Sequence, residues 1–112
     1  MIWQTRIDLP RAARIARVEE ENYRVRTYTL DVNSEAVPGQ FAMVWLPGVE
    51  ERPLSLLSSH PVAFTVAQVG PFTTALNALQ PGDRLWLRGP YGNGFDLRGR
   101  RILCLGGGYG VA

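Results

Sequence analysis

Lysine is absent from this sequence, and all twelve of its basic side chains are arginines. The arginines are scattered along the chain and mixed with ten acidic residues, which leaves a formal net charge of only +2 at pH 7. A nucleic-acid-binding surface needs a clustered basic stripe, and an oligonucleotide-binding barrel also needs aromatic side chains interleaved with that stripe. Neither pattern is present, so the sequence argues against a nucleic-acid partner.

Cysteine and histidine each occur once, as Cys104 and His60. A single thiol forms no internal disulfide and supplies no cysteine-ligated metal or iron–sulfur site from this chain alone. No apolar run reaches the roughly 20 residues that span a membrane, and residues 1–18 lack the apolar core of a signal peptide. We therefore expect a cytoplasmic protein with no membrane partner and no metal site. No paired carboxylates and no Ser-His-Asp set stand out, so we expect no catalytic residue.

Short apolar runs separated by turn signals dominate the 112 residues, a length that suits one domain. In Val25–Leu30, for example, branched or aromatic residues alternate with polar ones, which is typical of a half-buried strand. Glu19–Asn22 is predicted to be the acidic turn of a hairpin. The predicted strands cover residues 15–18, 25–30, 41–46, 54–58, 63–69 and 84–88.

One segment, Thr73–Leu79, has the pattern of a helix. Its threonines suit an N-cap, Leu76 and Leu79 share one face, and Gln80-Pro81-Gly82 ends it. About six short strands and one short helix predict an all-β protein, namely a small, closed, antiparallel Greek-key β-barrel.

The end of the sequence has a different pattern. Ile102–Leu105 is a fully apolar run typical of a parallel strand, and the glycine-rich residues 106–110 follow it directly. An apolar strand that leads into a glycine-rich turn begins a nucleotide-binding βαβ unit. We therefore predict a barrel domain over residues 1–98 and, over residues 99–112, the first strand and glycine turn of an incomplete α/β domain.

The motif Arg52-Pro53-Leu54-Ser55 is the first that carries chemistry, and it lies at the start of a predicted strand. Arginine supplies a fixed positive charge and a planar fork that suit a phosphate. Ser55 offers a hydroxyl and a backbone N–H that we expect to reach a heterocycle on the same strand face. Taken alone, the four residues also fit a turn arginine followed by an ordinary strand serine.

Two glycine-containing segments are further candidates. Gly70-Pro71-Phe72-Thr73 joins a predicted strand to the helix, whose free N–H groups and positive dipole end form a ready site for a pyrophosphate. In Gly89–Phe95, three glycines permit unusual backbone paths, and Tyr91 and Phe95 could cover an apolar ring. Each segment alone also fits a structural role, as a capped helix or as an elaborate turn.

Together, an Arg-Pro-x-Ser strand, a Gly…Thr helix start, a Gly-Pro-x-Gly loop and an apolar strand with a glycine turn follow one another in the chain. This order resembles the ferredoxin–NADP reductase superfamily, in which an antiparallel barrel binds FAD and a following α/β domain binds NAD(P). With Pro38–Phe41 included, the pattern is most similar to electron-transfer subunits of dihydroorotate dehydrogenase, particularly archaeal-looking ones. Hydrogenase or sulfhydrogenase γ subunits share much of it. The resemblance covers nearly the whole chain.

The resemblance implies a role for each matching residue. Arg52 would hold the FAD pyrophosphate, and Ser55 would approach the flavin N5 edge. Pro53 and Leu54 would lie along the ring and the ribityl chain. The remaining matches are Thr65, Val66 and Ala67 in a second FAD-binding strand, Gly70, Phe72 and Thr73 at the FAD phosphates, and Gly106, Gly107, Gly108 and Gly110 in the NAD-binding turn.

Two positions depart from the family pattern. Val66-Ala67 replaces a common aromatic–basic pair, which removes a stacking ring and a charge. Phe72 stands where glycine is common, and we expect its side chain to crowd the pyrophosphate. Both departures would weaken FAD binding without abolishing it.

Members of the family also carry an NAD-binding domain and a C-terminal [2Fe–2S] cluster, and they pass electrons to a catalytic dehydrogenase subunit in pyrimidine biosynthesis. This sequence matches only the first strand and glycine turn of that domain and has no cysteine cluster, so we expect an oxidoreductase component that performs the FAD step and is not a complete enzyme alone. A cofactor-free barrel that serves as an assembly piece for a partner subunit remains the alternative.

Overall fold

Strands make up most of the computed structural model, which describes residues 2–3 and 9–94. Alternation of buried and exposed side chains is regular in Phe41–Leu46, as expected for a strand with one face on a core. The elements in these residues are β1 Ile2–Trp3, β2 Arg11–Asn22, β3 Val25–Leu30, β4 Asn33–Ser34, β5 Phe41–Leu46, β6 Glu50–Ser55, β7 Ser58–Ser59, β8 Val62–Ala67, α1 Pro71–Asn77 and β9 Arg84–Tyr91.

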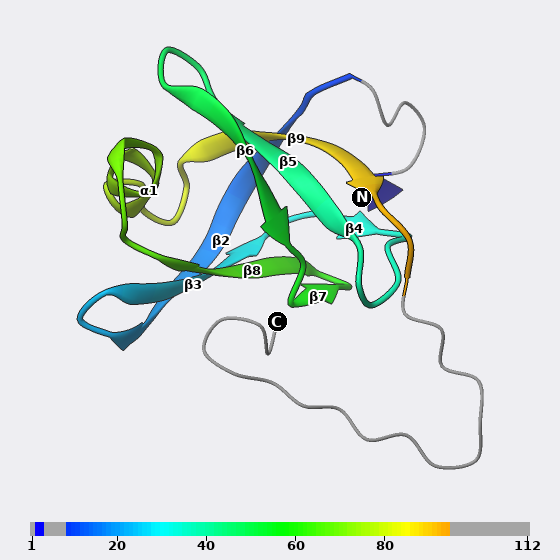
Figure 1. Cartoon of the computed structure of the whole chain (residues 1–112), viewed down its shortest axis with the longest axis horizontal. Coiled ribbons are helices and arrows are strands. Elements are labelled where there is room, and N and C mark those ends of the chain that lie inside the picture. The colour runs from blue at the N-terminus through cyan, green and yellow to red at the C-terminus, as the bar shows by residue number, and fades with distance from the viewer. Residues whose placement is uncertain (1, 4–8, 95–112) are drawn as a thin grey trace.

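Seven of these strands form one antiparallel sheet in the order β6-β5-β9-β2-β3-β8-β7, and β1 pairs with β4 in a separate parallel ribbon. Hairpins join β2 to β3, β5 to β6 and β7 to β8, while β9 returns to lie between β5 and β2. The sheet curls so that the end of β6 comes next to β8 (Figure 1). The predicted all-β, antiparallel fold with one short helix is therefore confirmed.

The sheet has two free edges, because hydrogen bonds between the described strands do not close it into a ring. The closed barrel predicted from the sequence is wrong in this respect. One edge is β6, where Pro53 has no N–H to donate to a further strand. The edge of β6 is therefore open, and β6 lies next to β8. These two strands contain most of the predicted FAD-binding residues.

The core lies inside the curl of the sheet. Its largest fully buried side chains include Tyr28 and Phe64, whose rings pack 5.9 Å apart. Helix α1 adds Phe72 and Leu76 to the same cluster. At the end of α1, the Tyr28 hydroxyl donates to the carbonyl of Leu76 at 3.2 Å, and Arg26 Nη1 donates to the carbonyl of Asn77 at 2.9 Å. These bonds satisfy terminal helix carbonyls and hold α1 on β3.

The predicted acidic turn Glu19–Asn22 is wrong, because these residues belong to β2 and the hairpin turn is Tyr23-Arg24. The charged side chains are accommodated in the strand by partners on β3. Glu20 Oε1 accepts from Arg26 at 2.9 Å, and Glu21 Oε1 accepts from the hydroxyl of Thr27 at 2.9 Å.

Other boundaries also differ from the prediction, notably those of β6 and α1. The strand expected over residues 54–58 is instead β6, which begins at Glu50 directly after a turn closed by Val49 N–H donating to the Leu46 carbonyl at 2.9 Å. Helix α1 begins at Pro71, two residues before the predicted start, because proline suits the first position of a helix.

The predicted domain boundary near residue 98 and the strand and glycine turn predicted over residues 99–112 lie outside the described residues. Across the residues that the structure does describe, no helix has the length and apolar character needed to cross a bilayer.

Candidate functional site

The register of β6 against β5 assigns the residues of the first motif to two faces. Arg52 lies opposite Val44 and Leu54 opposite Ala42, and both partners are buried in the core. Because residues opposite each other in an antiparallel pair share a face, the side chains of Arg52 and Leu54 belong to the core side of the sheet. Ser55, which lies opposite Phe41, belongs to the other face, so its hydroxyl and the Arg52 guanidinium are on different faces of the strand.

The backbone N–H of Ser55 nevertheless points toward the open edge of the sheet. Leu56 N–H donates back to the Gln40 carbonyl at 3.4 Å, that is, toward β5. Successive amides of a strand point in opposite directions, so the Ser55 N–H is directed away from β5. A ligand along this edge could therefore meet the Ser55 amide as well as the side chains of Arg52 and Leu54.

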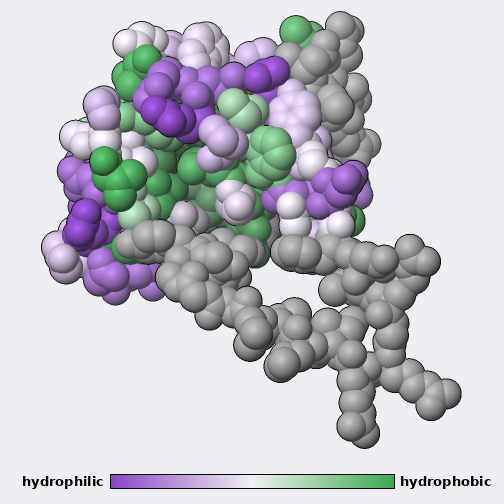
Figure 2. Space-filling view, in the orientation of Figure 1, coloured by the Kyte–Doolittle hydropathy of each residue, from purple (hydrophilic) through white to green (hydrophobic). Residues whose placement is uncertain are grey.

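Arg52 is the most exposed of the charged side chains of β6. Its side chain is 58% exposed, and its Nε lies 3.2 Å from Oε1 of Glu50. An ion pair this exposed is weak, so the guanidinium is available to an anion from solution. Beside it, Leu54 is partly buried against the core. Figure 2 shows apolar surface gathered in the middle of the face on which Figure 1 draws β6, β8 and α1, with hydrophilic residues around it.

The second predicted segment lies in β8, which passes beneath β6 in Figure 1. Val66 is buried in the core, whereas Thr65 and Ala67 are partly exposed. The Thr65 hydroxyl lies 2.9 Å from that of Thr27 on the neighbouring strand. The side chains of this segment therefore mainly build the fold, and Val66 belongs to the core.

At the start of α1, the side chains are committed to the protein itself. Thr73 Oγ1 accepts from the N–H groups of Val69 at 2.8 Å and Gly70 at 2.9 Å, and it donates to the Gly70 carbonyl at 3.0 Å. Phe72 is 3% exposed and packs in the core, so its side chain does not crowd a phosphate as the sequence suggested. At Gly70, by contrast, an added Cβ would meet nothing within 4 Å. This segment therefore presents backbone rather than side chains to a ligand.

The third motif begins within β9, which extends through Tyr91, and Gly92–Gly94 follow the end of the strand. Gly92 adopts φ +86° and accepts a hydrogen bond at 2.9 Å from Nε2 of Gln40, a residue of the Pro38–Phe41 stretch to which the sequence assigned no role. The Tyr91 ring packs 5.8 Å from that of Phe41. Phe95 and the predicted NAD-binding glycines 106–108 and 110 lie outside the described residues.

Sequence reasoning also missed an ion-pair cluster on the outer face of the sheet. Arg88 Nε and Nη2 donate to the two carboxylate oxygens of Glu51, each at 2.7 Å, and Nη1 donates to the Tyr91 hydroxyl at 3.4 Å. Trp45 and Trp86 lie opposite each other one row further along, with ring centroids 5.8 Å apart. Nothing in the local sequence pairs Glu51 with Arg88, because they are 37 residues apart.

We expect this ion pair to make stability depend on pH. Hydrogen bonds from Arg88 hold the pKa of the Glu51 carboxyl below its usual range, against an opposing effect of burial. A lowered folded-state pKa stabilises the protein above the ordinary glutamate pKa of about 4.3, and the gain is lost as the pH falls through the folded pKa. Glu51→Gln should cost about 1 kcal/mol at pH 7. Denaturant titrations should show this difference disappearing well below pH 4.3, and a difference that persists there would contradict the assignment.

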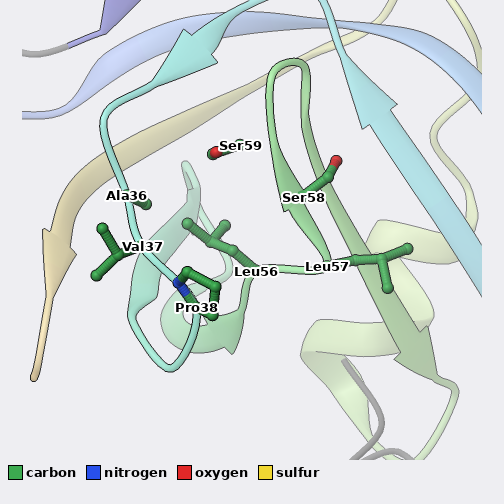
Figure 3. Close-up of a pocket in the computed structure, with 7 residues that line it drawn as sticks. All are labelled: Ala36, Val37, Pro38, Leu56, Leu57, Ser58 and Ser59. Carbon is green, nitrogen blue, oxygen red and sulfur yellow. The ribbon is translucent and has the colours of Figure 1, made fainter. Parts of the chain in front are cut away.

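A separate small cavity of about 90 Å³ lies beyond the end of β6. Figure 3 shows Val37, Pro38 and Leu56 close together in its lining, with Ser58 and Ser59 nearby. Ligand pockets for drug-sized molecules are about 300–1,000 Å³, so this cavity is too small for a dinucleotide. None of the predicted cofactor-binding residues lines it.

No family model matches the chain. It is 51% identical over 87 residues to a Thermococcus kodakarensis protein named probable dihydroorotate dehydrogenase B (NAD(+)), electron transfer subunit, a match that covers 78% of this chain and 36% of that protein. A Methanocaldococcus jannaschii protein of the same name is 42% identical over 106 residues, covering 95% of this chain and 40% of that protein. The chain is a homologue of these electron-transfer subunits. It spans well under half the length of either relative.

Two solved structures agree with the fold of this electron-transfer-subunit homologue. A ferredoxin reductase in carbazole 1,9a-dioxygenase superposes with a TM-score of 0.78 and 32% identity, covering 92% of this chain and 36% of that one. The cytochrome b5 reductase domain of Ulva prolifera nitrate reductase superposes with a TM-score of 0.66 at 17% identity, covering 77% of this chain and 41% of that one. The second likeness concerns the fold alone. The predicted ferredoxin-reductase-like fold is thus confirmed.

Proposed function

We propose that this chain is the FAD-binding module of a dihydroorotate dehydrogenase electron-transfer subunit, an oxidoreductase component of pyrimidine biosynthesis. The observation that carries the proposal is the 51% identity to a protein named as such a subunit. The chemistry of the site also supports it, because Arg52 is exposed at an open edge of the sheet, next to apolar surface. A flavin combines an apolar ring with a strongly anionic phosphate end, and this edge offers a surface for each.

Within the module, the residues of β6 would divide the work of holding FAD. Arg52 would bind the pyrophosphate through its guanidinium fork. Leu54, with Val66 of the core, would contact the apolar ring and ribityl chain, and Pro53 would leave the strand edge free of a competing neighbour. The Ser55 N–H, directed away from β5, would donate to the flavin N5 edge. When bound, FAD supplies the electron chemistry, and the protein supplies position and electrostatics.

The start of α1 would contribute less than the sequence suggested. The Thr73 hydroxyl already makes three hydrogen bonds within its own segment. A phosphate would therefore have to compete for that hydroxyl or bind backbone around Gly70, where there is open space. For this reason Arg52, rather than Thr73, would provide most of the affinity for the pyrophosphate.

Electrons would pass from this module to a catalytic dehydrogenase subunit, the partner that the relatives' name implies. NAD and [2Fe–2S] binding would belong to parts of a full-length subunit other than the described barrel. Neither a hydrogenase or sulfhydrogenase γ subunit nor a cofactor-free assembly piece is favoured, because relatives at 42–51% identity are named as dihydroorotate dehydrogenase subunits.

The test of this function is a visible absorption spectrum of the purified chain, recorded before and after addition of FAD and desalting. Flavin absorption that stays with the protein is the expected result, because the ring and phosphate surfaces act on one ligand. A folded protein that loses all added flavin on desalting, and gives no saturable signal in a flavin titration, would contradict the proposal.

A further inference from the structure

The carboxylate of Glu50 lies beside the guanidinium of Arg52, the group proposed to bind the pyrophosphate. Residues 50 and 52 are two apart in β6 and lie opposite Leu46 and Val44, so their side chains share one face of the strand. Glu50 Oε1 and Arg52 Nε are 3.2 Å apart. A phosphate oxygen that is bound by this guanidinium would come close to the Glu50 carboxylate or displace it.

Glu50 is held in this position by the hairpin before it. Gly48 adopts φ +82°, a conformation that favours glycine, and Val49 N–H donates to the Leu46 carbonyl at 2.9 Å. Glu50 itself pairs with Leu46 as the first residue of β6. Its backbone is therefore fixed, although its side chain remains 36% exposed and can rotate toward solvent.

Within the described residues, the elements that pack most extensively against β6 are β5, β8 and α1, and β5 contains no charged residue. Neither β8 nor α1 contains a charged residue. The adjacent carboxylate of Glu51 lies on the opposite face of β6, where it binds Arg88. Glu50 is thus the acidic side chain that shares a face with Arg52.

We infer that Glu50 competes with the phosphates of the bound flavin for Arg52 and so lowers the affinity of the site. This inference rests on the proposed function, because it assumes that Arg52 binds the pyrophosphate. Two effects act in the same direction. The ion pair must be broken or rearranged when the phosphate binds, and the negative carboxylate then remains next to a negative ligand. Both effects come from charge, so both should weaken as salt screens them.

The experiment compares Glu50→Gln with Glu51→Gln at pH 7. Both variants remove one negative charge from neighbouring positions of the same strand, but only residue 50 faces Arg52. Titration of each with FAD at low ionic strength should give a Kd about fivefold lower than wild type for Glu50→Gln and an unchanged Kd for Glu51→Gln. The gain should nearly vanish at about 1 M salt, where the Debye length is about 3 Å.

Riboflavin, which has the same ring and no phosphate, separates this effect from a change in the ring surface. Its Kd should be the same for wild type and Glu50→Gln. An equal gain for riboflavin and FAD, an equal gain for the two variants, or an unchanged FAD affinity in Glu50→Gln would each overturn the inference while FAD binding by wild type still supported the proposed function. If none of the folded proteins binds FAD, the proposed function fails and the inference fails with it.

Discussion

Replacement of Arg52 with alanine is expected to weaken FAD binding by about 1–2 kcal/mol, the scale of a hydrogen bond to a charged group. The corresponding rise in Kd is about 5- to 30-fold. Arg52 is 58% exposed and has only a weak surface ion pair with Glu50, so its loss should leave the fold intact. A flavin titration monitored by absorption or fluorescence measures the change, and circular dichroism checks the fold.

Arg17→Ala is the matched control for this variant. Arg17 is also an exposed strand arginine paired with a glutamate two residues away, at 2.8 Å from Glu19. It lies on β2, which is separated from β6 by β5 and β9 in the sheet. Arg17→Ala should leave the Kd for FAD unchanged. An equal loss in both variants would point to net charge rather than to a phosphate contact at Arg52, and no loss in either would remove Arg52 from the site.

Phe72→Ala is expected to lower the free energy of unfolding by about 3–5 kcal/mol, the usual cost of emptying a buried aromatic site. The Phe72 side chain is 3% exposed and belongs to the core cluster that joins α1 to the sheet. Its removal would leave a cavity and loosen the helix. The quantity to measure is the midpoint and slope of urea unfolding, with FAD absent so that ligand binding does not contribute.

The same variant distinguishes two views of this position. If Phe72 crowded the pyrophosphate, as the sequence suggested, alanine would improve FAD binding at little cost in stability. Burial in the core predicts the opposite, namely a large loss of stability with no gain in affinity. Thr74→Ala, at an exposed position of the same helix, should change stability by no more than about 0.5 kcal/mol. Similar stabilities for the two variants would contradict the assigned packing of Phe72.

Strands with regular local patterns were predictable from the sequence. Val25–Leu30 and Phe41–Leu46 have the predicted bounds, because side-chain alternation in these segments reports directly on one buried face. The charged ends of strands were not predictable in this way. Glu19–Asn22 has the composition of a turn and becomes a strand only because Arg26 and Thr27 on β3 provide partners for its carboxylates.

The residues of the candidate site were likewise selected from the sequence. The face of the strand on which each side chain lies was not predictable from it. The motif around Arg52 was recognisable because it stands in order with the Gly…Thr helix start, the Gly-Pro-x-Gly loop and the final glycine turn, an order that resembles the ferredoxin–NADP reductase superfamily. The separation of Arg52 and Ser55 onto different faces, and the direction of the Ser55 amide, depend on the register of β6 against β5. A strand exchanges its faces when its register shifts by one residue, and that register is set by the hairpin and the core together.

The sequence by itself therefore determined the all-β class, the single helix, the resemblance to ferredoxin-reductase-type flavoproteins and the chemical types at the site. Those properties follow from local composition, from the spacing of apolar residues and from the order of the motifs, all of which can be read from the sequence alone. Only the tertiary structure decided that the sheet stays open at β6, that Phe72 is a core residue, and that Glu50 faces Arg52 while Glu51 binds Arg88. These outcomes depend on which distant segments pack together, and burial, register and ion pairing between remote residues exist only after that packing has occurred.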